Sequence, residues 1–365
     1  MKRRESVGVI YPTSLGVIPK YPVQEPVKTR EVSSEECIVL GEVVNSIPPV
    51  DACVPVEDLN KHILVTGATG SGKTFTVATL VNRLTTREYP FNYRPLVLDW
   101  HGEYGRLLKN PKVVDPFQLP VPLFGDEDPN ASVDFASQVL ALTPAQEYVL
   151  LKAFENLRGW DHLDLTGVIE TLEKMVDESG WFRESRLSLM RKLRRLVVGK
   201  YRGLFKETRI GFLDNARSPL VIDLSRVGDL TIRRVYVAAL LKKIFDLAVR
   251  GEFGVSKLLV VVEEARNLLG KENHVDVLVK MLDEVRKFGV GLVVVSQSPS
   301  SLVEDVMVNT STKIVHSVKS AVDLEVLDKA TNMPVELREV IPYLDKGEAV
   351  LFSGLYKKPL LVKVV

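Results

Sequence analysis

The stretch Gly67-Ala68-Thr69-Gly70-Ser71-Gly72-Lys73-Thr74 directly follows the apolar run Ile63-Leu64-Val65 and precedes a helix-compatible segment, Phe75 to Leu84. A glycine-rich turn between a buried strand and a helix aims backbone N–H groups and the positive end of the helix dipole at one point, which favours a phosphate chain. In such a loop Lys73 reaches the outer phosphates, and the hydroxyl of Thr74 ligates the Mg²⁺ that accompanies the nucleotide. The octapeptide therefore predicts a phosphate loop that binds ATP or GTP, with Gly67 through Thr74 as its nucleotide contacts.

The composition is that of a folded globular protein. The 365 residues are 45% hydrophobic and 26% charged, close to the average of globular domains. No apolar stretch approaches the roughly 18 to 20 residues that cross a bilayer, and no secretory segment follows the N-terminus. We therefore expect a cytoplasmic protein without membrane contact. The cysteines, Cys37 and Cys53, lack the spacing and histidine neighbours of a zinc site, so we expect buried free thiols.

The charge of the chain is balanced overall but not locally. The net charge of +1 gives no general argument for nucleic acid. Between Arg183 and Arg209, however, ten Lys and Arg residues stand against two Glu residues. This segment is either a solvated helix face paired with acidic neighbours or a surface that faces DNA or another subunit.

Apolar runs that end near polar residues recur along the chain and alternate with helical patterns. They are Arg94–Asp99, Pro219–Asp223, Leu258–Val262, Gly291–Val295, Thr312–Val315, Ala349–Phe352 and Leu360–Val364, with a long helix from about Leu230 to Val249. Such strands predict an α/β fold whose parallel sheet is covered by helices on both faces. Ligands of these sheets gather at the carboxyl ends of the strands.

Four segments are expected from these patterns. Residues 1–60 contain short Val- and Ile-rich pieces, which predict a small β-rich segment: Val7–Tyr11, Gly16–Ile18 and Cys37–Val44. Apolar residues at helical spacing from about Pro144 to Val198 predict an inserted helical lobe, residues 126–215. Residues 61–125 and 216–365 then form the two parts of the nucleotide-binding core.

Two strand ends carry carboxylates suited to nucleotide hydrolysis. The run Leu258–Val262 ends in Glu263 and Glu264, and neighbouring side chains on a strand point opposite ways. We expect Glu263 to hold Mg²⁺ through its water shell and Glu264 to orient and deprotonate the attacking water. Glu103 is the alternative base, because it follows the strand that ends at Asp99. Asp99 and His101 are further candidates for positioning water.

Two other side chains are candidates for sensing or stabilising the γ-phosphate. Gln297 follows the run Gly291–Val295 and can donate to a phosphate oxygen while it accepts from water. Loss of the phosphate would then move its loop. Arg286 lies near a helix end and can neutralise charge on the transferred phosphoryl group, in its own subunit or a neighbour's. The alternative for Arg286 is a favourable interaction with the helix dipole alone.

These motifs together resemble the HerA branch of the HerA/FtsK DNA-translocating ATPases. The resemblance runs from about residue 38 to the C-terminus and rests on Gly67–Thr74, Asp99–Tyr104 (DWHGEY), Glu263-Glu264-Ala265, Arg286–Leu292 (RKFGVGL) and Ser296-Gln297. It implies a RecA-like core in a homo-hexameric ring that hydrolyses ATP with Mg²⁺ between subunits and pulls double-stranded DNA through a channel, in end processing or repair. It also implies that Asp99 lies with the nucleotide-binding residues, Glu264 is the base, Gln297 the sensor and Arg286 an arginine that acts on nucleotide.

The chain departs from the family pattern in three places. Arg266 and Ser298 stand where the family often has histidine and arginine. Only 66 residues precede the phosphate loop, where HerA proteins usually carry a complete β-barrel, so the expected relative is a shortened one. Archaeal HerA proteins work with a nuclease, NurA, and the resemblance does not cover docking of that nuclease through the barrel.

The sequence leaves other functions open. A related pump for viral packaging or conjugation would use the same core, and a nucleotide-gated clamp or protein remodeller would use the ring for binding. If DNA is the partner, contacts to its phosphates would be independent of base sequence. The candidate contact loops are Asn267–His274, which contains Lys271, and Gly105–Lys112.

Overall fold

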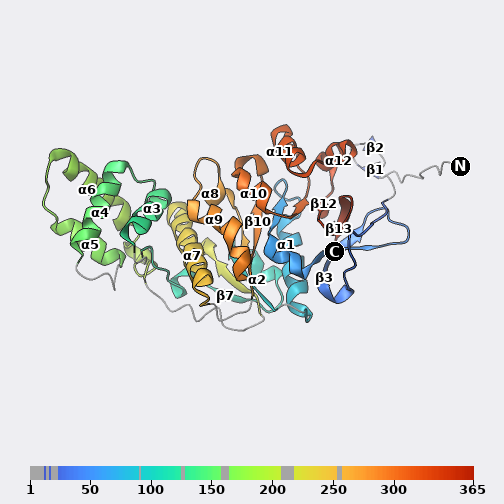
Figure 1. Ribbon diagram of the computed structural model, residues 1–365, viewed down its shortest axis with the longest axis horizontal. Helices are drawn as coiled ribbons and strands as arrows, with labels where there is room; N and C mark the ends of the chain where they lie inside the picture. The colour runs from blue at the N-terminus through green and yellow to red at the C-terminus, as the bar shows by residue number, and fades with distance from the viewer. Residues whose placement is uncertain are drawn as a thin grey trace.

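The computed structural model describes residues 12–13, 16–17, 24–89, 92–124, 128–157, 164–206, 218–252 and 257–365. The molecule is elongated, with a sheet in its middle and a group of helices at one end (Figure 1). Those helices are α4 (Pro144–Asn156), α5 (Leu165–Lys174) and α6 (Gly180–Arg195). The strand expected at Val7–Tyr11 and the basic residue Arg209 lie outside the described residues.

An 11-stranded sheet organises the described chain, in the order β4-β3-β13-β12-β11-β5-β10-β9-β6-β8-β7. From β11 to β7 every neighbouring pair is parallel. From β4 to β11 the neighbours are antiparallel. The bounds are β3 (Cys37–Val43), β4 (Asp51–Pro55), β5 (Ile63–Thr66), β6 (Tyr93–Asp99), β7 (Lys112–Val114), β8 (Leu220–Asp223), β9 (Lys257–Val262), β10 (Val290–Ser296), β11 (Thr312–Val315), β12 (Glu348–Phe352) and β13 (Leu360–Val364).

The predicted parallel sheet is confirmed in its main part, and β12 and β13 depart from it. These two strands are joined by residues 353–359 only, which is too short for the crossover that parallel neighbours need. They pair as a hairpin, with Val350 opposite Leu361. β3 and β4 then continue the main sheet beyond β13, whereas β1 (Pro12–Thr13) and β2 (Gly16–Val17) pair with each other in a separate two-stranded sheet.

Alternate residues of the central strands face two different hydrophobic cores, which explains why these strands are apolar throughout. In β9, Val260 and Val262 face the core covered by α7 and α9, whereas Leu259 and Val261 face the core covered by α1. The helices of the core are α1 (Lys73–Thr86), α2 (Tyr104–Leu107), α3 (Pro129–Leu140), α7 (Leu230–Arg250), α8 (Arg266–Leu269), α9 (Asp276–Glu284), α10 (Glu304–Asn309), α11 (Ala321–Thr331) and α12 (Val335–Val340).

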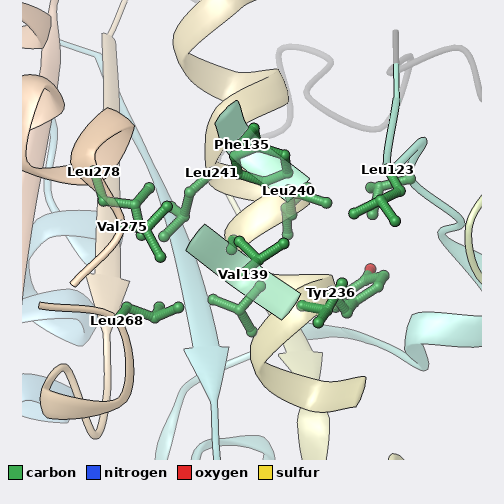
Figure 2. Close-up of a cluster of buried hydrophobic side chains, with 14 of the residues drawn as sticks. Leu123, Phe135, Val139, Tyr236, Leu240, Leu241, Leu268, Val275 and Leu278 are labelled. Carbon is green, nitrogen blue, oxygen red and sulfur yellow. The ribbon is translucent and has the colours of Figure 1, made fainter. Parts of the chain in front are cut away.

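The helix α3 connects the helical lobe to the core. Figure 2 shows Phe135 and Val139 of α3 beside Tyr236, Leu240 and Leu241 of α7. All of these side chains are buried in one cluster, and each contributes about 1.5–3 kcal/mol relative to an exposed position. Capping side chains start each helix of this region by accepting a backbone N–H, which sets the helix boundaries: Asp128, Thr143, Asp164 and Ser179.

Four arginines of the basic segment that begins at Arg183 form ion pairs with acidic neighbours. Arg183 and Arg186 pair with Asp177, Arg194 pairs with Glu173, and Arg195 pairs with Asp229. Lys192 donates to the carbonyl of Ala141 and to Gln146. These contacts favour the solvated helix face over a DNA-facing surface. Among the described residues, no helix is both long and apolar enough to cross a membrane.

The expectation of free thiols is wrong, because Cys37 and Cys53 form a disulfide. Cys37 begins β3 and Cys53 lies in β4, and the antiparallel register pairs Val39 with Cys53. The two cysteines therefore share a face as diagonal neighbours, with Cα atoms 5.6 Å apart. Sequence spacing could not reveal this contact, since it depends on the pairing of the two strands.

Reduction of this disulfide should destabilise the protein. The cysteines are 16 positions apart, and the entropy of closing such a loop is worth about 3 kcal/mol. We expect a reductant to lower the urea midpoint of the wild-type protein and to leave that of a C37S/C53S double variant unchanged. If the reductant leaves the urea midpoint of the wild-type protein unchanged, the result would contradict a stabilising disulfide.

Candidate active site

The phosphate loop connects β5 to α1 at the carboxyl edge of the parallel strands. Gly67, Gly70 and Gly72 have φ angles of 148°, 78° and 116°, a range that other residues rarely adopt. A Cβ atom on Gly67 would lie 2.6 Å from Cβ of His316, and one on Gly72 would lie 3.1 Å from the nitrogen of Gly347. At Gly67 and Gly72, both backbone conformation and close packing therefore require glycine.

The ammonium of Lys73 lies folded onto its own loop. It donates to the carbonyl oxygens of Gly67, at 2.7 Å, and Ala68, at 2.9 Å. Burial lowers the pKa of Lys73, and the carboxylates of Glu264 and Glu263 act in the opposite direction. A phosphate oxygen is a stronger partner for a desolvated ammonium than a carbonyl, so this position suits an anion at the mouth of the loop.

Glu263 is a buried carboxylate that lacks a full set of partners. Glu263 directly follows β9 and is 5% exposed, and its Oε2 has no hydrogen-bond partner among the described residues. Burial raises its pKa to about 8, the hydroxyl of Tyr104 acts in the opposite direction, and the carboxylates of Asp99, Glu103 and Glu264 raise it as well. A divalent cation would relieve this burial cost. With the half-buried hydroxyl-bearing residue Thr74 at the start of α1, the oxygen donors present fit Mg²⁺.

Glu264 lies at the centre of a chain of polar contacts. Its Oε1 accepts from Nε2 of Gln297 at 2.7 Å and lies 3.5 Å from Nε2 of His101. Oε1 of Gln297 in turn accepts from the hydroxyl of Thr69 at 2.9 Å. Glu264 has a φ of 45°, a conformation that costs energy for a residue with a side chain and is common at functional sites. These polar contacts connect the phosphate loop to Gln297 after β10, to Glu264 after β9 and to the loop of His101 after β6.

Asp99 organises the loop that follows β6. Its Oδ1 accepts the backbone N–H groups of His101, Gly102 and Glu103, and its Oδ2 accepts that of Tyr104. These contacts give Asp99 a loop-shaping role and do not support nucleotide contact. The loop presents His101 toward Glu264. Glu103 is exposed on the same loop, near enough to raise the pKa of Glu263.

Arg286 does not join the other candidates. It is exposed in the turn η8 (Val285–Phe288), directly before β10. Gln297 follows the far end of the same seven-residue strand, so roughly 20 Å of strand separate the two edges of the sheet. Within one chain, Arg286 therefore lies at the amino edge, and the phosphate loop at the carboxyl edge.

Two buried histidines flank β5, and the motif analysis misses both. His316 donates from Nδ1 to the carbonyl of Glu348, at 2.8 Å, so its Nε2 accepts from the hydroxyl of Thr76, at 2.9 Å. Burial lowers its pKa to about 4, so His316 packs against Gly67 as a neutral side chain. Its place after the predicted strand Thr312–Val315 is the signal that could have marked it. His62, at the other end of β5, carries no comparable signal.

A glycine-rich loop between a strand and a helix, a glutamine after the neighbouring strand β10 and an acidic pair after the next strand, β9, define a P-loop ATPase with a RecA-like core. VirB4 of Thermoanaerobacter pseudethanolicus has this fold, with a TM-score of 0.69 at 17% identity over 92% of this chain and 98% of that one. The family model for the central domain of helicase HerA matches residues 38–244. The chain belongs to the HerA helicase family.

Two archaeal relatives match most of the chain. The DNA double-strand break repair helicase HerA of Sulfurisphaera tokodaii is 28% identical over 371 residues, which cover 91% of this chain and 70% of the relative. The protein of the same name from Sulfolobus acidocaldarius is 26% identical over 356 residues, covering 89% and 68%. The match thus includes the phosphate loop and the strand ends that build the site.

Glu263 makes the stability of the nucleotide-free protein depend on pH. Because its folded pKa, about 8, lies above the ordinary 4.5, the folded state holds a proton that unfolding releases, and stability falls as pH rises through that window. Glu263→Gln removes this loss. We expect the stability advantage of the variant to grow between pH 5 and pH 8, by on the order of 3 kcal/mol, and to level off above pH 8. Thermal melts of both proteins across this range would show the trend, and a pH-independent difference would refute it.

Proposed function

We propose that the chain is the subunit of a homo-hexameric ring motor that hydrolyses ATP with Mg²⁺ and translocates or unwinds double-stranded DNA in end processing or repair. The observation that carries this proposal is the pair of hydrogen bonds from Thr69 to Gln297 and from Gln297 to Glu264, which join the phosphate loop to the proposed sensor and the proposed base on a HerA-family fold. The DNA substrate and the repair role follow from the names of the HerA relatives. A NurA-type nuclease as partner rests on the resemblance alone.

The site geometry supports a division of labour among its residues. The loop N–H groups and Lys73 would bind the phosphates, while Thr74 and Glu263 would hold the Mg²⁺ that neutralises phosphate charge. Glu264 would accept the proton of the attacking water. In the structure, Oε1 of Glu264 accepts a hydrogen bond from the amide of Gln297. A γ-phosphate oxygen that competes for this amide would free Glu264, so that the base acts only when ATP is bound.

The position of Arg286 supports assembly. An arginine at the amino edge of the sheet cannot serve the site at the carboxyl edge of its own chain, but it can serve the site of a neighbour packed head to tail. Head-to-tail contacts of this kind close into rings when the rotation between subunits allows it. Arg286 would then stabilise the charge that develops during phosphoryl transfer in that neighbour.

DNA contact is proposed for the loop between α8 and α9. Arg234 holds this loop against α8 by donating to the carbonyl oxygens of Asn267, in α8, and Asn273, in the loop, and Lys271 is exposed on the loop. A braced backbone with an exposed lysine suits contact with DNA phosphates, which gives salt-sensitive binding without base specificity.

Substitution of the acidic candidates should separate the base from its alternative. We expect Glu264→Gln to lower kcat for ATP by about 10³-fold or more, because no other group takes the proton of water, while ATP still binds. Glu103→Gln is the matched control and should retain hydrolysis within about tenfold. Lys73→Ala should abolish turnover. Steady-state hydrolysis with and without duplex DNA measures all three, and a Glu103→Gln loss with an active Glu264→Gln would reverse the assignment.

Mixing two inactive variants should restore hydrolysis. Arg286→Ala leaves the nucleotide site of its own subunit intact, whereas Lys73→Ala leaves Arg286 intact. If the arginine acts on a neighbour, mixed rings contain sites with an intact lysine and an intact arginine, so their activity exceeds that of either variant alone. Lys287→Ala, a change in the adjacent exposed residue, should be active by itself. An absence of recovery in rings that demonstrably mix would place the arginine outside the neighbour's site.

A further inference from the structure

His62 is a buried residue at the start of the strand that leads to the phosphate loop. It follows the turn η2 (Val56–Lys61) and directly precedes β5. The residue is 1% exposed. Its φ of 62° is unusual for a residue with a side chain, so surrounding contacts must hold it in place.

The imidazole of His62 bridges two elements that are distant in sequence. Its Nδ1 accepts the backbone N–H of Leu292, in β10, at 3.0 Å. A nitrogen that accepts from N–H carries no proton in the neutral ring, so Nε2 bears the proton and donates to the carbonyl of Leu282, also at 3.0 Å. Burial lowers the pKa of His62 to about 4, and the nearby charge of Arg286 lowers it as well. The ring therefore stays neutral at ordinary pH, with both bonds in place.

The backbone around His62 leaves little freedom for the elements that it joins. The amides of Ser311 and Thr312, at the start of β11, donate to the carbonyls of Lys61 and His62. A Cβ atom on Gly291, in β10, would lie 2.2 Å from the carbonyl oxygen of Leu59. The starts of β5, β10 and β11 thus form one tightly packed unit around this residue.

The hydrogen bond from His62 to Leu282 attaches the end of α9, which leads into the turn with Arg286, to the packed starts of β5, β10 and β11. Leu282 lies in the last turn of α9, where helix carbonyls take partners from outside the helix. Arg286 follows four residues later in η8. From His62, β5 leads to Gly67, and from Leu292, β10 leads to Gln297. One imidazole therefore connects the two strands that end in the nucleotide site to the turn that carries the arginine.

We propose that His62 is a positioning residue, which fixes Arg286 to the strands carrying the phosphate loop and Gln297 of the same subunit. Through this link, the nucleotide state of one subunit determines the position of its Arg286 relative to the nucleotide site of the neighbouring subunit. The inference rests on the proposed function, in which Arg286 acts on the neighbouring site.

Two substitutions separate the two bonds of the imidazole. In the His62→Asn variant the amide oxygen takes the place of Nδ1, so this variant keeps the bond from Leu292 and loses the link to Leu282. In the His62→Gln variant the amide nitrogen takes the place of Nε2, so this variant keeps the link to Leu282 and loses the other bond. Asparagine tolerates a positive φ better than glutamine. A purely structural role therefore predicts that His62→Asn is the milder change, and the positioning role predicts the opposite for turnover.

The experiment measures ATP hydrolysis by the full chain with duplex DNA. We expect His62→Asn to lower kcat about tenfold with KM for ATP within about twofold, and His62→Gln to stay within about threefold of wild type. Mixing His62→Asn with Lys73→Ala subunits should restore activity, as mixing does for Arg286→Ala. Hydrogen exchange of the amides at residues 283–289 should be faster in His62→Asn than in His62→Gln. If His62→Asn does not fold, His62→Gly, which lacks both bonds and the backbone strain, is compared with His62→Gln, which keeps the link to Leu282.

The outcomes distinguish the inference from the function on which it rests. Full activity of Arg286→Ala, or an Arg286→Ala defect that mixing does not repair, would contradict the action of Arg286 on the neighbouring site, which is the part of the proposed function on which the inference rests. If Arg286→Ala behaves as proposed, equal losses in His62→Asn and His62→Gln would overturn the positioning role. So would a defect in His62→Asn that persists in mixed rings, since such a defect would belong to its own nucleotide site.

Discussion

The parallel register of β5, β10, β9 and β6 is the constraint on which the rest of the site depends. Thr66 pairs with Ser296, and Val262 pairs with both Val294 and Leu98. The residues that follow these positions are therefore brought to one edge of the sheet. Each strand is apolar on both faces because helices cover both. A slip of the register by one residue would turn each strand side chain toward the opposite core and would also displace the site residues that follow the strands. Core packing and site geometry are one constraint here.

The same packing leaves the charged groups of the site poorly satisfied before nucleotide binds. Lys73 and Glu263 are both shielded from water. Burial lowers the pKa of Lys73 and raises that of Glu263, and each shift favours the neutral form of the side chain. A phosphate chain with a divalent cation would satisfy the two groups at once, because it brings negative charge to one and positive charge to the other. The neutral histidines at the two ends of β5 add rigidity without adding charge. Within the site, this electrostatic cost falls on the two groups that a nucleotide and its cation would engage.

The sequence predicts the sheet, and it indicates which strands the candidate site residues follow, because both depend on local pattern. A run such as Leu258–Val262 shows a buried strand, and polar residues after it show where that strand meets solvent. Contacts between segments that are distant in the sequence cannot be predicted from local pattern. The hairpin direction of β12 and β13, the Cys37–Cys53 disulfide and the contacts of His62 with Leu282 join segments whose relation appears only in the folded chain. Asp99 was identified as a site residue, but its four backbone contacts could not be read from its position.

The helical lobe leaves the sheet after β7 and returns at β8, and these two strands are neighbours. The excursion therefore begins and ends at nearly the same place, on the edge of the sheet farthest from β4. Within it, α3 packs on the core, whereas α4, α5 and α6 pack on one another. Evolution can lengthen, replace or delete such a closed loop of structure while the strands that carry catalysis keep their order. The stretch after α3 is accordingly the natural graft point for exchanging lobes between members of the family.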